Sequence, residues 1–194
     1  MRIGIEGRTL QGPRYGVARY LRNLLRHLVE IGPEHDYIIY LSQPIEPLGI
    51  DSGALSSREI FMRPSHLRLP LAMRKDGVDL HFSPSYFLPL LKLCPAVVVV
   101  HDLIIKVHPE WFSASPRFRF DGLFWRAVKG AERIITVSEH SRGDIVRLLG
   151  VDPARVAVIP EAADEFFRPV EDEGALAGIR ERHGLPEGFI LTVG

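Results

Sequence analysis

The residues with the clearest capacity for chemistry follow the most hydrophobic segment of the chain. The apolar segment 96–100 leads directly into His101 and Asp102. A histidine in this place can donate or accept a proton or bind a polar ligand, and the adjacent carboxylate can orient it. A histidine bonded to a backbone carbonyl for purely structural reasons fits the sequence equally well. We predict His101 and Asp102 as candidate catalytic residues.

A glycine-bearing loop, residues 7–16, lies between a short apolar segment and an amphipathic helix. Free backbone N–H groups at a helix N-terminus suit an anionic ligand, and glycine allows that ligand a close approach. The spacing is not GxGxxG, which disfavours a nicotinamide dinucleotide. Gly12 and Gly16 are predicted to bind an anionic group, with simple turn formation as the alternative, and Arg14 and Tyr15 are predicted to line the cleft.

Two further polar groups follow apolar segments of strand length. Ser138, Glu139 and Arg142 follow residues 134–137, where helix capping by Ser138 is the competing interpretation. Glu161 follows residues 155–159, where a solvated loop carboxylate is the competing interpretation. We predict that these four side chains line a cleft, because ligands of open α/β sheets bind beyond the carboxyl ends of the strands.

Aromatic and basic side chains gather between residues 111 and 129. This composition suits a membrane interface or a lipid-linked substrate. Phe118, Phe124, Trp125 and Val128 could instead face the core of the domain. The residues predicted for a membrane or acceptor patch are Trp111, Phe112, Arg117, Arg119, Arg126 and Lys129.

Composition narrows the class of protein. The 194 residues are 46% hydrophobic, and 24 basic residues balance 24 acidic ones, so no overall charge favours nucleic acid. A lone Cys94 excludes an internal disulfide and fits a reducing compartment. No signal peptide, membrane-spanning run or metal-ligand spacing is present, and a cytoplasmic protein with at most peripheral membrane contact is expected.

Strand and helix signals alternate along the whole chain and predict an α/β fold, a Rossmann-like open parallel sheet flanked by helices. In residues 96–100 the odd-numbered and the even-numbered side chains, which point to opposite faces of a strand, are all apolar. This indicates a central strand buried on both faces. The predicted strands are 2–6, 37–41, 59–62, 78–82, 96–100, 133–137 and 155–159, and the predicted helices are 17–31, 66–76, 116–131, 138–149 and 171–183. Residues 42–57 and 103–115 are predicted loops.

The last residues, 189–194, have the pattern of a buried strand running into a glycine turn. Such strands open βα units, so we expect two parts: residues 1–168 as one Rossmann-like domain, and residues 169–194 as a linker and the first strand of a second, truncated domain.

The order of these motifs resembles the N-terminal half of GT-B retaining glycosyltransferases of family 4, also called group 1. The resemblance rests on the glycine loop, His101-Asp102, the run 135–144 beginning Ile-Thr-Val-Ser-Glu-His, and the run 156–160 followed by Asp164, Phe167 and Pro169. The run 101–112 is most similar to that of bacterial mannosyltransferases that build surface polysaccharides.

The resemblance implies transfer of a hexose from a UDP- or GDP-sugar to a glycan or lipid-linked acceptor. The expected location is the cytoplasm, with at most peripheral contact at the inner face of the plasma membrane. Gly16 would then lie against the donor diphosphate, His101 would contact the transferred sugar with support from Asp102, and Ser138 and Glu139 would line the cleft. No metal cofactor is expected.

The chain departs from the family at Glu161-Ala162, where members commonly carry Asn-Gly, so no family role transfers to Glu161. The paired glutamates and the basic residues that neutralise the leaving diphosphate belong to the second domain. We therefore expect little activity from residues 1–194 alone. The alternatives are another GT-B enzyme, such as a sugar-nucleotide epimerase or a phosphorylase, and a non-catalytic Rossmann-like binding module.

Overall fold

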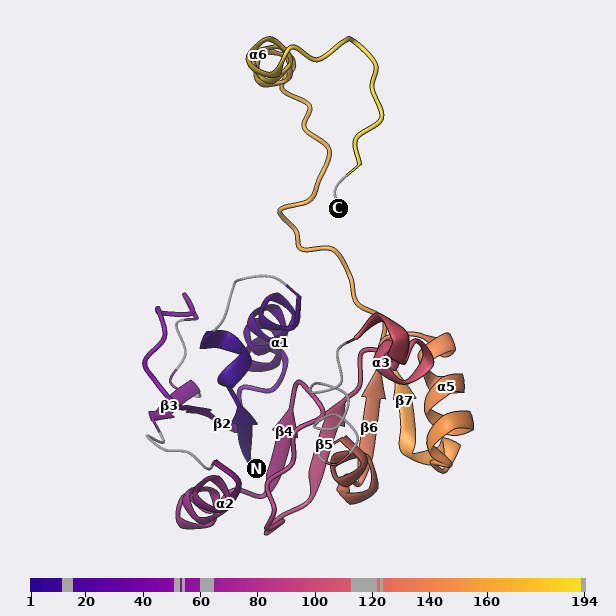
Figure 1. Ribbon diagram of the computed structural model, residues 1–194. Helices are drawn as coiled ribbons and strands as arrows, with labels where there is room; N and C mark the ends of the chain where they lie inside the picture. Colours follow the sequence, from indigo (N-terminus) through magenta and orange to yellow (C-terminus); the bar gives the residue numbers. More distant parts are fainter. Residues whose placement is uncertain are drawn as a thin grey trace. The chain divides into compact units, whose positions relative to one another are not determined.

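The computed structural model (Figure 1) describes residues 1–11, 16–50, 53, 55–59, 65–112, 122 and 124–192. The chain divides into two compact units, Met1–Glu161 and Ala162–Gly194. Gly12, Arg14, Tyr15, Arg117 and Arg119 lie outside the described residues, so their predicted roles stay predictions.

The first unit is built on a seven-stranded sheet in the order β3-β2-β1-β4-β5-β6-β7, with every neighbouring pair parallel. The order runs one way from β1 to β3 and the other way from β4 to β7, so the topology switches between β1 and β4. The strands are β1 (Arg2–Glu6), β2 (Asp36–Leu41), β3 (Leu55–Glu59), β4 (Leu80–Ser83), β5 (Ala96–Val99), β6 (Arg133–Thr136) and β7 (Val156–Val158).

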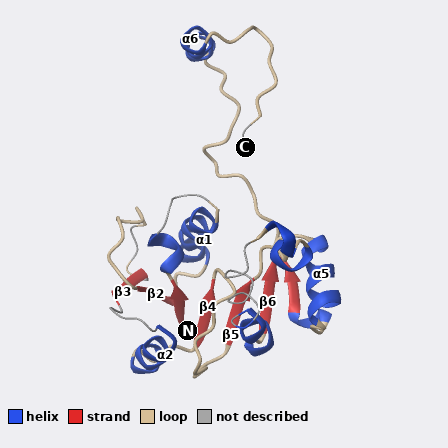
Figure 2. Ribbon diagram, viewed as in Figure 1, coloured by secondary structure: helices blue, strands red, loops and turns tan. Residues whose placement is uncertain are grey.

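Helices separate most of the successive strands (Figure 2), but among the described residues β3 follows β2, and β5 follows β4, without a helix between them. In the first unit the helices are η1 (Arg8–Gln11), α1 (Val17–Ile31), α2 (Ser65–Lys75), α3 (Ile104–Val107), η2 (Pro109–Trp111), a helix that includes residues 124–130, α5 (Glu139–Leu149) and η3 (Pro153–Arg155). The predicted Rossmann-like α/β fold is therefore confirmed, and α2 forms even though Pro70 lies inside it.

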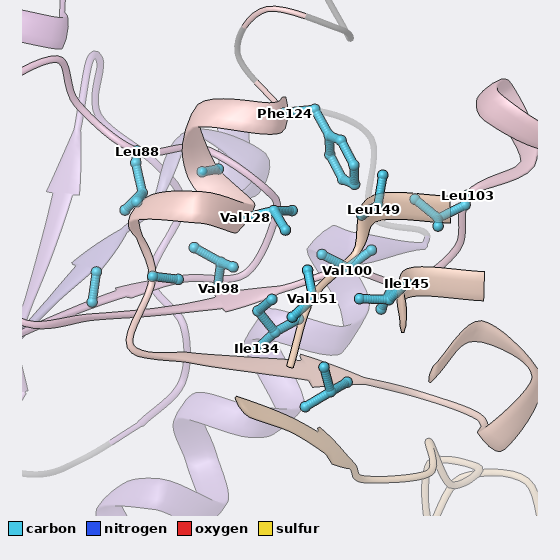
Figure 3. Packing of buried hydrophobic residues seen from close by; sticks show 14 residues of the cluster. Leu88, Val98, Val100, Leu103, Phe124, Val128, Ile134, Ile145, Leu149 and Val151 are labelled. Carbon is cyan, nitrogen blue, oxygen red and sulfur yellow. The ribbon is translucent and has the colours of Figure 1, made fainter. Parts of the chain in front are cut away.

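The central strand β5 is buried on both faces, as its composition predicts. Val98 and the following Val100 pack with Ile134, Phe124 and Ile145 on the face covered by α5 and residues 124–130 (Figure 3). Val99 packs on the opposite face with β1, β2 and α1, through residues that include Ile5, Leu21, Leu25, Tyr37 and Ile39. Apolar layers on both sides of β5 hold its carboxyl end, and therefore His101, in a fixed place.

Two predictions for the first unit need correction. The strand predicted at 59–62 corresponds to β3 at Leu55–Glu59, which begins within the predicted loop 42–57 and pairs with β2 as an edge strand. Residues 60–62 of that prediction lie outside the described residues. The sequence of β3, LSSRE, lacks an apolar pattern because an edge strand need not bury both faces. The predicted loop 103–115 contains α3 and η2.

The second unit contains α6 (Glu173–His183). The side chain of Asp172, just before the helix, accepts from the Ala175 N–H, and Gly184, just after it, has a φ of 60°. The predicted strand at 189–194 is not formed in residues 189–192, and Ile190 is 97% exposed. An apolar strand is stable only beside a partner strand, and the described part of this unit holds none.

Candidate functional site

The candidate site lies at the carboxyl ends of four parallel strands. His101 follows β5, Ser138 follows β6, Glu161 follows β7, and Pro84 follows β4. Parallel strands bring these positions to one edge of the sheet, which is where ligands of open α/β sheets bind.

Both ring nitrogens of His101 have partners. Nδ1 lies 3.1 Å from Oε1 of Glu161, and Nε2 lies 3.1 Å from the backbone oxygen of Pro84. A carboxylate and a carbonyl are both acceptors, so both bonds form at once only when each ring nitrogen carries a proton. The His101 side chain is 21% exposed and that of Glu161 is 47% exposed, so the Glu161 bond is the one open to solvent.

Tyr20 completes the surroundings of His101. Its ring, in the first turns of α1, meets the His101 ring edge to face with centroids 5.0 Å apart. Burial, and to a smaller extent the negative charge of Glu161, raises the pKa of the Tyr20 phenol to about 12, so the phenol stays neutral. The sequence places Tyr20 only within the predicted helix 17–31, because no local pattern links it to His101.

Asp102 does not orient the His101 ring as predicted. Its Oδ1 instead accepts from the backbone N–H of Ile104 at 3.0 Å, at the beginning of α3. Aspartate commonly bonds to the backbone two residues on, and this local bond forms without any rearrangement of the chain. The carboxylate that contacts the ring is that of Glu161, sixty residues away in sequence.

The group at the beginning of α5 acts mainly as a helix cap. Ser138 Oγ accepts from the Ser141 N–H at 3.1 Å, and Ser141 Oγ donates to the backbone oxygen of His101 at 3.1 Å. Glu139 and Arg142 pair with each other on the helix surface at 3.3 Å. Ser141, which lies within the predicted helix 138–149, thus links α5 to the backbone of His101.

Gly16 has a backbone that suits only glycine. It precedes α1 with φ 57° and ψ −130°, and no side-chain bond caps the helix there. A Cβ added at Gly16 would meet nothing within 4 Å, so the backbone conformation, rather than crowding, requires glycine. Gly16 supplies no side-chain cap to the first N–H groups of α1, and an uncapped helix N-terminus of this kind can bind an anion.

The predicted aromatic and basic patch divides into two places. Arg126 and Lys129 line a cavity of about 430 Å³ together with Lys92 and Trp125, and Lys129 Nζ lies 5.1 Å from the centre of the Trp125 ring. Trp111 lies in η2, 62% exposed and stacked on His108, and half-buried Phe112 follows it. Phe124 and Val128 belong to the core, as the alternative interpretation held.

The described ranges hold neither a metal-ligand cluster nor a membrane-spanning helix. Among these residues, no cluster of three histidine, cysteine, aspartate or glutamate side chains could hold a metal ion. Within the same ranges, none of the helices has the length and apolar character needed to cross a membrane.

The sheet order, the flanking helices and the polar edge define an α/β domain of the GT-B glycosyltransferase type. Residues 15–165 match the model of Glycosyltransferase Family 4, and the chain belongs to that family. This agrees with the resemblance noted in the sequence.

One curated relative and several crystal structures are similar to this chain. O-antigen chain mannosyltransferase B of Escherichia coli is 24% identical over 123 residues, which cover 63% of this chain and 32% of the relative. A glycosyltransferase of Rickettsia africae superimposes with a TM-score of 0.58 at 13% identity, over 96% of this chain and 50% of that one. HepE of Anabaena, solved with UDP and glucose, superimposes with a TM-score of 0.57 at 15% identity, over 94% of this chain and 50% of that one.

The likeness to the crystal structures concerns the fold. The chain spans about a third of the length of the mannosyltransferase and about half the length of these two structures.

Proposed function

We propose that this chain is the acceptor-side half of a retaining glycosyltransferase that moves a mannose-like hexose from a UDP- or GDP-sugar to a glycan or lipid-linked acceptor. The membership of residues 15–165 in Glycosyltransferase Family 4 carries this proposal. The similarity to an O-antigen chain mannosyltransferase supports the mannose-like donor and a role in surface polysaccharide synthesis. HepE, solved with UDP and glucose, supports a nucleotide-sugar donor.

His101 contacts the transferred sugar in this proposal. Since both its nitrogens are occupied, an incoming hydroxyl must replace one partner. Glu161 is the exposed partner and Pro84 the more buried one, so the sugar takes the place of Glu161 at Nδ1 while Pro84 keeps the ring oriented through Nε2. Ser138 and Glu139 line the cleft beside it, and the N-terminus of α1 at Gly16 faces the donor diphosphate.

The leaving diphosphate is neutralised without a metal, by the α1 N-terminus and by basic residues of a second domain. Residues 169–194 form the connection to that domain, so residues 1–194 alone release little nucleotide. The protein works in the cytoplasm.

The experiment that tests this function is nucleotide release by the complete protein. UDP or GDP is measured with a panel of sugar nucleotides, with and without acceptor extracted from membranes, and residues 1–194 serve as the control. Acceptor-stimulated release by the complete protein supports glycosyl transfer. Conversion of the donor without acceptor would favour another GT-B enzyme, and no release from a folded protein would favour a binding module.

Peripheral membrane contact through α3 and η2 is part of the proposal. Ile104, Val107 and Trp111 are exposed apolar side chains on this short segment, and Lys106 lies among them. Such a segment can enter the headgroup region of an anionic bilayer. Trp111→Glu should reduce sedimentation with phosphatidylglycerol vesicles, whereas Ile31→Glu, at an apolar residue 77% exposed elsewhere, should not. Equal sedimentation of both variants would contradict this contact.

A further inference from the structure

The topological switch point of the sheet carries an ion pair that the predicted site does not include. Glu6 ends β1 and is 2% exposed, and its Oε1 accepts from the backbone N–H of Arg8 at 3.0 Å and from Arg8 Nε at 2.6 Å. Its Oε2 is buried and has no hydrogen-bond partner among the described residues. A buried carboxylate of this kind is costly, so Arg8 must stay beside it.

One face of the Arg8 guanidinium also packs against an aromatic ring. Its Cζ lies 3.8 Å from the centre of the Phe87 ring, and Phe87 is itself 7% exposed in the segment that follows β4. Gly7, between the paired residues, has no room for a side chain, because an added Cβ would lie 2.5 Å from Ile39 and 2.8 Å from Leu41. The backbone, the carboxylate and the aromatic ring together therefore set the position of Arg8.

These contacts leave one edge of the guanidinium without a described hydrogen bond. Glu6 binds Nε, so Nη1 and Nη2 remain, and the Arg8 side chain is 41% exposed. Two parallel N–H donors on a fixed, charged plane match the oxygens of a phosphate or carboxylate. An arginine needed only to neutralise Glu6 would not require this exposed edge.

The place of Arg8 suits a ligand site. It follows β1, and Phe87 follows β4, so the pair lies where the strand order reverses, the usual binding crevice of an open α/β sheet. The same segment supplies the Pro84 oxygen that holds His101. Neighbouring strands are about 5 Å apart, so the ends of β1 and β5, on either side of β4, are about 10 Å apart.

We propose that Arg8, held by Glu6 and Phe87, binds an oxyanion of the substrate through its Nη1 and Nη2 edge. The proposal rests on the proposed glycosyl transfer for the identity of the substrate. The oxyanion belongs either to the donor diphosphate or to a phosphate on a lipid-linked acceptor. The chemistry at Arg8 is the same in both cases.

Binding by the complete protein tests this proposal without any need for turnover. Pyrophosphate and UDP represent the donor, polyprenyl phosphate in detergent micelles represents the acceptor, and uridine is the neutral control. We expect Arg8→Gln to weaken binding of at least one anion by about tenfold or more, and Arg8→Lys, which keeps the charge but not the two-donor edge, to weaken it by a smaller factor. Arg147→Gln, at an exposed arginine paired with Asp144 on α5, should change nothing.

The class of anion affected identifies the source of the oxyanion. Equal binding of all the anions by wild type and a folded Arg8→Gln variant would overturn the proposal. If Arg8→Gln does not fold, the Arg8 side-chain NMR signal of the wild type decides: a shift with the anions but not with uridine supports the site, and no shift overturns it. Anion binding through Arg8 without nucleotide release would refute the proposed transfer and leave this site standing.

Discussion

Glu161 Oε1 lies 3.1 Å from Nδ1 of His101, although sixty residues separate the two in the sequence. The bond joins the end of β7 to the end of β5, and it occupies the more exposed nitrogen of the histidine. Glu161 therefore stands where a substrate hydroxyl would bind, and it competes with the substrate for His101.

This competition predicts the effect of removing Glu161. In the complete protein, Glu161→Ala should lower the KM for the substrate that contacts His101 by about two- to tenfold, since one exchanged hydrogen bond is worth about 0.5 to 1.5 kcal/mol. Glu161→Gln keeps an oxygen at Nδ1 but not the charge, so its KM should stay near that of wild type. A KM that rises in Glu161→Ala would mean that Glu161 positions the ring for the substrate.

Tyr20 is predicted to act through its ring rather than its hydroxyl. Tyr20→Phe keeps the edge contact with His101 and should leave kcat nearly unchanged. Tyr20→Ala removes a ring contact worth about 0.5 to 1.5 kcal/mol. It should lower kcat by up to about tenfold, because the His101 ring loses a contact that helps to hold its orientation. Steady-state kinetics of both variants check this, and an equal loss in Tyr20→Phe would assign the role to the phenol instead.

Gly16 is predicted to be required by its backbone. Gly16→Ala should reduce the free energy of unfolding by about 1 to 3 kcal/mol, since φ 57° with ψ −130° is strained for any other residue. Gly143, inside α5 with open space around it, is the matched control, and Gly143→Ala should stabilise the protein by about 0.5 to 1 kcal/mol. Urea unfolding measures both, and no loss of stability in Gly16→Ala would contradict the strain.

His81 predicts how stability depends on pH. Its side chain, in β4, is fully buried, and burial lowers the pKa of the imidazole to about 4 from the usual 6.5, although nearby backbone groups of Phe87 and Gly4 partly favour the charged form. The unfolded chain binds this proton more readily, so stability is full above pH 6.5 and is lost as the pH falls from 6.5 toward 4, by about 3 kcal/mol.

The measurement is urea unfolding of wild type and His81→Gln at pH 7 and pH 4.5, with His27→Gln, at an exposed histidine of α1, as the control. The decrease in stability toward pH 4.5 should be smaller in His81→Gln than in the other two proteins. The same decrease in all three would exclude His81 as its cause.

The fold was largely predictable because its strongest signals are local. Val97 to Val100 place apolar side chains on both faces of their strand, which requires a core on each side of the sheet. Ser138 and Gly150 mark the ends of α5 with a cap and a left-handed residue. β3 was misplaced because an edge strand with one partner carries no apolar pattern.

The site was only partly predictable because its contacts are long-range. His101 was selected from its place after the central strand, but its partners, Tyr20, Pro84 and Glu161, come from three other segments. The neighbouring Asp102 was the natural choice from sequence, and it bonds to its own backbone instead. Which partner a side chain bonds to depends on the direction in which the side chain points, and the order of residues alone does not give that direction.

The most direct test of the central claim is the turnover of His101→Ala in the complete protein, measured as acceptor-dependent release of UDP or GDP from the best donor. We predict a loss of about 100-fold or more with the fold intact by circular dichroism, and no loss in His27→Ala. Unchanged turnover in a folded His101→Ala variant would remove His101 from the site and contradict the account.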